Sequence, residues 1–117
     1  MNIIDLASKV LKYAETNKEG FTLNIKTLEP VTSGIVVSYK ATQSSFSEND
    51  VLSVINHALK HDCVVGGWYN SEDKRFYFDS NKIFSNIAKA INFGIENEQI
   101  AIFDIDNLHE IRLDKQL

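Results

Sequence analysis

The chain has 117 residues, of which 44% are hydrophobic and 24% charged, and it carries a net charge of −4. This composition is typical of one globular domain, residues 1–117, with enough apolar surface for a single core. No charged segment precedes a long apolar run, so the sequence predicts neither a signal peptide nor a membrane span. The mild acidity argues against direct nucleic-acid binding, and the single cysteine excludes an internal disulfide and favours a reducing cytoplasm.

Three segments show helical periodicity, at about residues 2–17, 48–61 and 85–97. In each of them apolar side chains recur at steps of three and four residues, which places them on one side of a helix. The letters "SEND" at 47–50 have the Ser-x-x-acid form of a capping box and mark the start of the second helix. Ser85 is the expected N-cap of the third helix.

Each helical segment is followed by two segments in which apolar and polar residues alternate, as in half-buried β-strands. The first pair is "FTLNIK" with "GIVVSYKAT", the second is "VVGGWYN" with "KRFYF", and the third is "QIAIFDI" with "HEIRL". The sequence therefore predicts an α+β fold of three successive helix–strand–strand units, with a mostly antiparallel sheet and the helices on one face. The opposite face is then open to water or to a partner.

The segment "VVGGWYNSEDKRFYF" at 64–78 is the strongest candidate for a binding site. A four-residue loop at 70–73 pairs Trp68 with Arg75 and Gly66 with Tyr77, so that one face of the hairpin carries a Trp-Arg-Tyr cluster. These residue types dominate binding hot spots. The predicted partner-binding residues are Trp68, Tyr69, Arg75, Tyr77 and Asp79.

A packing explanation competes with this one. An aromatic ring opposite a glycine covers the bare backbone, so Gly66 and Gly67 also suit a well-packed corner. Arg75 stacked on Trp68 would then be only a local cation–π pair. An odd number of loop residues would turn Trp68 towards the core, so the register of the hairpin decides between the two hypotheses.

A second candidate lies in "HALKHDC", where His57 and His61 stand one helical turn apart and Asp62 and Cys63 follow. These residue types bind metals, and the set gives the alternative of a small-ligand or metal-binding domain. The set lacks the glutamate of the metalloprotease pattern and a second Cys or His pair, so the sequence predicts no metal and no cofactor. Boundary histidines and a buried, inert cysteine are the simpler interpretation.

Acidic residues gather near the last strands, where we expect a solvated rim that can face a basic surface on a partner. They are Glu96, Glu98, Asp104, Asp106 and Glu110. No phosphate-binding loop, dinucleotide fingerprint or serine elbow occurs in the chain, which argues against an enzyme.

Three stretches carry a resemblance to known proteins: "TLEPVTSGIVVSYKATQ", "ALKHDCVVGGWYNSEDKRFYFDSNKIF" and "AINFGIENEQIAIFDIDNLHEIRL". They resemble small uncharacterised proteins of phages, plasmids and conjugative elements in gut bacteria, which also occur as modules of large polyvalent mobile-element proteins. The resemblance covers most of the chain from Gly20 onward, and the stretches Gly-Gly-Trp-Tyr and Ala-Ile-Phe-Asp are its most specific parts. No assigned chemistry and no catalytic positions accompany it.

The resemblance implies a mobile-element context, in which small acidic proteins often bind and block a host defence nuclease, as anti-restriction and anti-CRISPR proteins do. We therefore expect a non-enzymatic, cytoplasmic protein-binding protein, with a counter-defence inhibitor as the leading hypothesis. It is expected to be a monomer or homodimer that contacts neither nucleic acid nor a membrane. A structural module that self-associates through the open sheet face is the remaining alternative.

Overall fold

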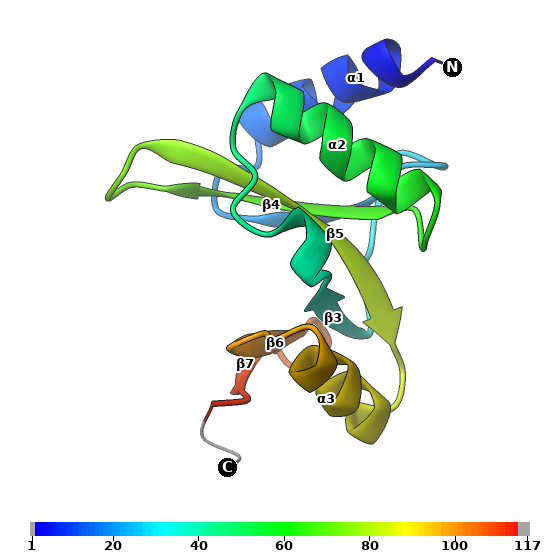
Figure 1. Ribbon diagram of the computed structural model, residues 1–117, viewed down its shortest axis with the longest axis vertical. Coiled ribbons are helices and arrows are strands. Elements are labelled where there is room, and N and C mark those ends of the chain that lie inside the picture. Colours follow the sequence, from blue (N-terminus) through cyan, green and yellow to red (C-terminus); the bar gives the residue numbers. More distant parts are fainter. Residues whose placement is uncertain (1, 115–117) are drawn as a thin grey trace.

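The computed structural model describes residues 2–114, which form three α-helices on one face of a seven-stranded antiparallel sheet (Figure 1). The α+β fold and the antiparallel sheet predicted from the sequence are confirmed. The helices are α1 (Ile3–Glu15), α2 (Glu48–Leu59) and α3 (Ile87–Glu96). None of the helices described is long and apolar enough to cross a membrane.

Side-chain caps fix where the last two helices begin. Ser47 and Asp50 form the predicted capping box at the start of α2. The cap of α3 is Asn86 rather than the predicted Ser85, because the Asn86 side chain accepts a hydrogen bond from the backbone amide three residues further on. These bonds satisfy amide groups that have no partner within the first turn of a helix.

The strands are β1 (Phe21–Asn24), β2 (Glu29–Pro30), β3 (Ile35–Ser38), β4 (Val64–Asn70), β5 (Arg75–Phe84), β6 (Ala101–Asp104) and β7 (His109–Arg112), and a 3₁₀ helix, η1 (Lys40–Thr42), follows β3. Their order across the sheet is β2-β1-β4-β5-β3-β6-β7. The two strands of the first predicted unit, β1 and β3, therefore do not pair with each other. The long hairpin of β4 and β5 separates them and forms the centre of the sheet.

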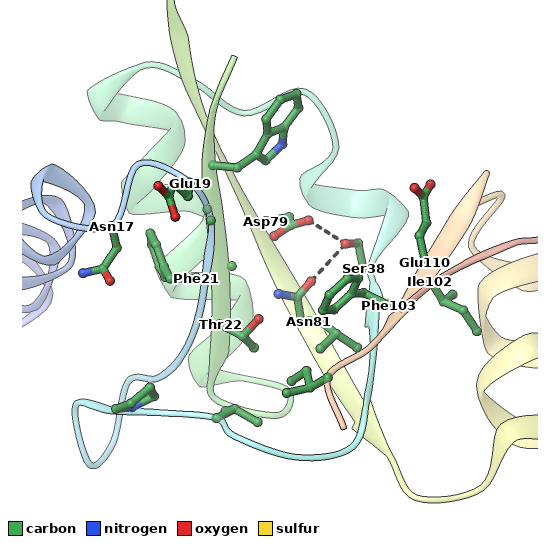
Figure 2. Close-up of a pocket in the computed structure, with 18 of the residues that line it drawn as sticks. Asn17, Glu19, Phe21, Thr22, Ser38, Asp79, Asn81, Ile102, Phe103 and Glu110 are labelled. Atoms are coloured by element: carbon green, nitrogen blue, oxygen red, sulfur yellow. Dashed lines mark hydrogen bonds between the residues drawn. The ribbon is translucent and has the colours of Figure 1, made fainter. Parts of the chain in front are cut away.

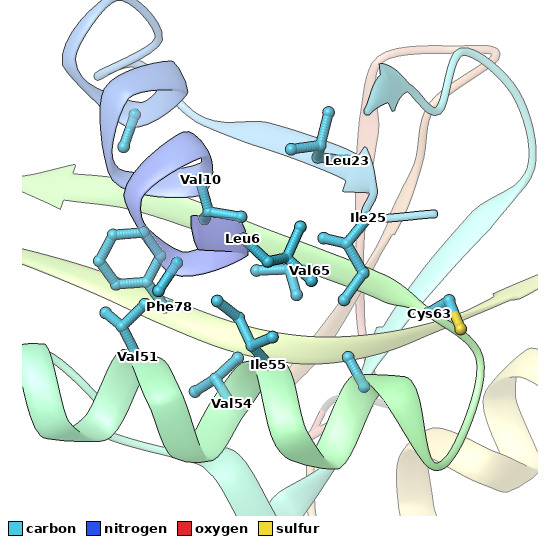
Figure 3. Close-up of a cluster of buried hydrophobic side chains, with 13 residues drawn as sticks. Leu6, Val10, Leu23, Ile25, Val51, Val54, Ile55, Cys63, Val65 and Phe78 are labelled. Carbon is cyan, nitrogen blue, oxygen red and sulfur yellow. The ribbon is translucent and has the colours of Figure 1, made fainter. Parts of the chain in front are cut away.

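The main core lies beneath α1 and α2, on the face of the sheet that the helices cover (Figure 3). Val10, Val54 and Ile55 of these helices are completely buried, as is Val65 of β4. A second, smaller cluster lies beneath α3 and consists of Ile35, Val37, Ala90, Ile102 and Leu113. The long strand β5 contributes to the sheet under both groups of helices.

Alternation along β5 divides its side chains between the two faces of the sheet. Phe78 and Ser80 point towards α2, whereas Tyr77, Asp79 and Asn81 point to the opposite face, which none of the described helices covers. We call this second face the open face. By the strand pairing it also carries Thr22, Val36, Ser38, Gly66, Trp68 and Phe103.

Candidate functional site

The hairpin of β4 and β5 pairs Trp68 with Tyr77 and Gly66 with Asp79. The loop therefore lies one residue further along the chain than predicted, and the predicted pairing of Trp68 with Arg75 is wrong. The pairing moves by two residues in all, which leaves every side chain on its predicted face because side chains alternate with a period of two. Trp68, Arg75, Tyr77 and Asp79 consequently share the open face, as the sequence predicts.

The chemistry of the turn sets this register. The Asn70 side chain accepts a hydrogen bond from the Glu72 amide at 2.9 Å, and the Asn70 carbonyl accepts one from the Lys74 amide at 2.8 Å. Lys74 has a φ of 60°, in the left-handed region. Asn70 is thus both the last paired residue of β4 and the first residue of the turn, which is why the sequence pattern placed it in the loop.

Gly66 makes room for two polar side chains of β5. A Cβ atom at position 66 would lie 2.4 Å from Nδ2 of Asn81 and 2.6 Å from Oδ1 of Asp79. The predicted covering of both glycines by aromatic rings is therefore wrong for Gly66. It holds for Gly67, where rings on the helix side fill the space that a Cβ would take.

Asp79, Ser38 and Asn81 form a hydrogen-bonded polar cluster at the centre of the open face (Figure 2). Oγ of Ser38 lies 2.5 Å from Oδ2 of Asp79 and 3.0 Å from Oδ1 of Asn81. Burial raises the pKa of Asp79 above 3.8, and the hydrogen bonds from Ser38 and Asn81 offset only part of this effect. Ser38 has one hydroxyl proton, so it can donate to Asp79 or to Asn81 but not to both at once.

The open face is hollowed into a cavity of about 920 Å³, which the polar cluster lines (Figure 2). Its charged lining residues are Glu19, Asp79 and Glu110, and no Lys, Arg or His side chain of residues 2–114 lines it. A second hollow of about 270 Å³ shares Ser38, Trp68 and Asp79 with the first. Both hollows therefore give access to the same carboxyl group.

An aromatic cluster continues the open face towards the tip of the hairpin. The rings of Trp68 and Tyr77 stack with centroids 5.8 Å apart, and Phe46 meets Tyr77 edge-on at 5.7 Å. The Arg75 guanidinium lies 4.3 Å from the centroid of Phe46, so the predicted stacking of Arg75 on Trp68 is not observed. Trp68 is 50% exposed and Phe46 is 41% exposed. Arg75 is exposed as well, and Tyr77 is partly buried between its neighbours.

Sequence reasoning missed Phe46. The backbone of Ser45 pairs with Phe78, which carries the segment before α2 alongside β5 and brings Phe46 to Tyr77. The sequence shows only a hydrophobic residue just before a helix cap. Its partners lie in a distant strand, so no local pattern identifies them.

Tyr69 lies apart from the other predicted binding residues. It follows Trp68 in β4 and so points to the face that the helices cover. Its ring is 6.4 Å from that of Phe76, and the Lys18 ammonium group lies 5.8 Å from its centroid. The predicted extension of the site to Tyr69 therefore does not follow from the geometry.

His57 of α2 and His61, which lies in the turn after α2, pack against each other on the helix side of the sheet. The rings of His57 and His61 stack with centroids 3.8 Å apart, and Nδ1 of His57 lies 2.8 Å from Oγ of Ser80. Tyr39 contacts both imidazoles, at 4.7 Å and 5.0 Å between ring centroids. The two imidazoles therefore join the C-terminal end of α2 to Tyr39, the residue that follows β3.

The other two proposed ligands are engaged elsewhere. Asp62 accepts the Tyr39 hydroxyl at 2.5 Å and pairs with the Lys82 ammonium group at 3.3 Å, whereas Cys63 is buried in the main core. Across the described part of the chain, no three His, Cys, Asp or Glu side chains are grouped so as to hold a metal ion. The geometry does not support the metal-binding alternative.

We expect stability to fall at acidic pH because of His57. Burial lowers the pKa of His57 below 6.5, the charge of His61 adds to this effect, and Asp62 opposes it. As the pH falls through 6.5, the unfolded chain takes up the proton at this residue before the folded chain does, so the free energy of unfolding decreases. His57→Gln should reduce this decrease, as measured by urea denaturation at about pH 7.5 and about pH 5.5.

His109→Gln is the control, because His109 is exposed on β7 and away from α2. It should keep the pH dependence of the wild type. A decrease in stability that is the same in the wild type and in His57→Gln would show that His57 does not cause it.

The acidic residues near the C-terminal strands have separate roles. Asp106 accepts a hydrogen bond from the Gly34 amide at 3.1 Å, and Asp104 accepts from the Asn107 side chain at 2.8 Å. Of the acids predicted to form a rim, only Glu110 lines the cavity.

The open face therefore combines exposed aromatic rings with a concave surface and one half-buried carboxyl group, an arrangement suited to holding a partner's side chain. Comparisons of this chain with protein-family models, with curated proteins and with solved structures find no match.

Proposed function

We propose that the protein is a non-enzymatic binding protein whose open face docks a protein partner. The observation that carries the proposal is the aromatic cluster of Trp68, Tyr77, Phe46 and Arg75, in which Trp68 and Phe46 are exposed, beside a cavity of about 920 Å³. Trp, Tyr and Arg are the residue types that contribute most of the binding energy at protein interfaces. An exposed apolar patch of this kind, next to a polar rim, is typical of an interaction site.

The resemblance to small proteins of mobile elements favours a host defence nuclease as the partner. The protein would then be a counter-defence inhibitor that acts in the host cytoplasm. Nucleases bind the phosphate backbone through basic surfaces, and an acidic protein with an acidic cavity is complementary to such a surface. Occupation of that surface would block the nuclease without any chemical step.

A nuclease-protection assay tests the proposal. Purified protein is titrated against restriction and CRISPR nucleases of gut bacteria, and uncut DNA is measured. We expect stoichiometric protection against the target nuclease. Trp68→Ala should weaken inhibition at least about 30-fold, which corresponds to about 2 kcal/mol and is the usual size of a hot-spot effect.

Tyr69→Ala is the matched control, because Tyr69 is the next residue of the same strand but points to the other face. It should inhibit nearly as well as the wild type, and circular dichroism should show that both variants are folded. Protection that is equally strong with folded Trp68→Ala would exclude the open face as the site. Failure to protect against any nuclease of the panel would exclude the counter-defence role.

A further inference from the structure

Among the described residues, every charged one that lines the cavity of the open face is acidic. Glu19, Asp79 and Glu110 line it, and no basic side chain of residues 2–114 does. In Figure 2, Glu19 and Glu110 lie on opposite sides of Asp79. A concave surface lined by charges of one sign concentrates the field within it, so the cavity attracts a cation.

Asp79 has unused capacity to accept hydrogen bonds. It accepts a hydrogen bond from Ser38, whereas an ionised carboxylate offers about four acceptor positions. Gly66 leaves it uncovered from the side of β4, since a Cβ there would lie only 2.6 Å from Oδ1. Because Asp79 lines both hollows, a group that enters either of them can reach its carboxyl group.

The chain itself supplies no guanidinium group to this carboxyl group. Its two arginines are held elsewhere: Arg75 lies over Phe46, and Arg112 pairs with Asp114 at 2.8 Å. Burial without an opposite charge raises the pKa of Asp79. A cation in contact with Asp79 offsets that cost and favours the ionised form.

We propose that the cavity receives the guanidinium group of an arginine side chain of the protein partner, with Asp79 as its counter-ion. A planar guanidinium suits the site better than an ammonium group, because it stacks on aromatic faces while it donates to a carboxylate. Trp68, 50% exposed, and Phe103, 40% exposed, supply such faces on the walls of the cavity. This assignment rests on the proposed protein-binding function and adds the chemistry of the group that is bound.

Nuclear magnetic resonance with a small probe tests the assignment without the partner. N-acetyl-L-arginine amide is titrated into the ¹⁵N-labelled full chain, and N-acetyl-L-citrulline amide, which has the same shape without the charge, is the comparison. We expect the arginine probe to shift the amide signals of Gly66, Asp79 and Asn81 and the indole signal of Trp68, and the citrulline probe to leave them in place. The corresponding lysine probe should bind more weakly than the arginine probe.

Asp79→Asn should weaken binding of the arginine probe at least about tenfold. This variant should fold, because an amide has nearly the same shape as a carboxyl group and its oxygen can still accept from Ser38. Glu72→Gln is the control of equal charge change; Glu72 is exposed in the hairpin loop and does not line the cavity. It should bind the probe as the wild type does.

Equal shifts with the citrulline probe, binding unchanged by Asp79→Asn, or tighter binding of the lysine probe would overturn the assignment. If one of these results is obtained while nuclease protection still depends on Trp68, the assignment fails and the proposed function stands. If the arginine probe binds as expected but no nuclease is inhibited, the proposed identity of the partner fails and the arginine site stands.

Discussion

Replacement of Ile55 by alanine should lower the free energy of unfolding by about 2–5 kcal/mol. Ile55 is 0% exposed and lies in the main core between α2 and the sheet (Figure 3). The substitution removes three buried carbon atoms, so the favourable free energy of transferring them out of water is lost. It also leaves a cavity that the packed neighbours fill only in part. Urea denaturation monitored by circular dichroism measures the change.

Ile4→Ala is the matched control, because it makes the same substitution in α1 at a side chain that is 70% exposed. It should change the free energy of unfolding by about 0.5 kcal/mol or less. Similar losses in the two variants would contradict the position of the core beneath α1 and α2.

Gly66→Val should destabilise the protein and also impair the open face. Any Cβ at this position collides with Asn81, which is 2% exposed, and with the Asp79 carboxyl group. Replacement of a glycine within a strand by itself raises the free energy of unfolding by about 0.5–1 kcal/mol, whereas forcing extra atoms into a packed site lowers it by about 1–3 kcal/mol. We therefore expect a net loss of stability in urea denaturation and weaker binding of the arginine probe.

Thr22→Val is the control for this substitution. Thr22 pairs with Gly66 across β1 and β4 and lies on the same face, but its replacement by valine keeps the volume of the side chain. It should leave the stability in urea denaturation close to that of the wild type; because Thr22 lines the cavity, it is a control for stability and not for probe binding. A Gly66→Val variant as stable as the wild type would mean that Asp79 and Asn81 are not held against β4.

The sequence alone predicted the layers of this fold and the faces of its central hairpin. Helices show in the three- and four-residue steps of apolar side chains, and the capping box at Ser47 and Asp50 marks a boundary to the residue. The predicted faces of Trp68 and Tyr77 are correct although the predicted register is wrong, because the register error is an even number of residues. Periodicity is thus a stronger signal than the position of a turn.

Long-range contacts could not be predicted in this way. The separation of β1 from β3 depends on which strands pair, and Phe46 reaches Tyr77 only because a distant segment runs beside β5. The sequence also did not predict that Gly66 makes room for the side chains of Asp79 and Asn81. Which side chains occupy that space depends on the strand that pairs with Gly66. The side of Tyr69 could have been predicted, because side chains alternate along a strand and Tyr69 is the neighbour of Trp68.

Fluorine nuclear magnetic resonance of the protein labelled at Trp68 tests most directly whether the open face is the docking surface. Trp68 is the only tryptophan of the chain, so 5-fluorotryptophan labelling gives one ¹⁹F signal from the edge of the cavity, free of background from an unlabelled partner. When the inhibited nuclease is added, we expect this signal to shift or broaden and to lose its sensitivity to exchange of water for deuterium oxide. A signal that stays unchanged while inhibition is complete would contradict binding through the open face.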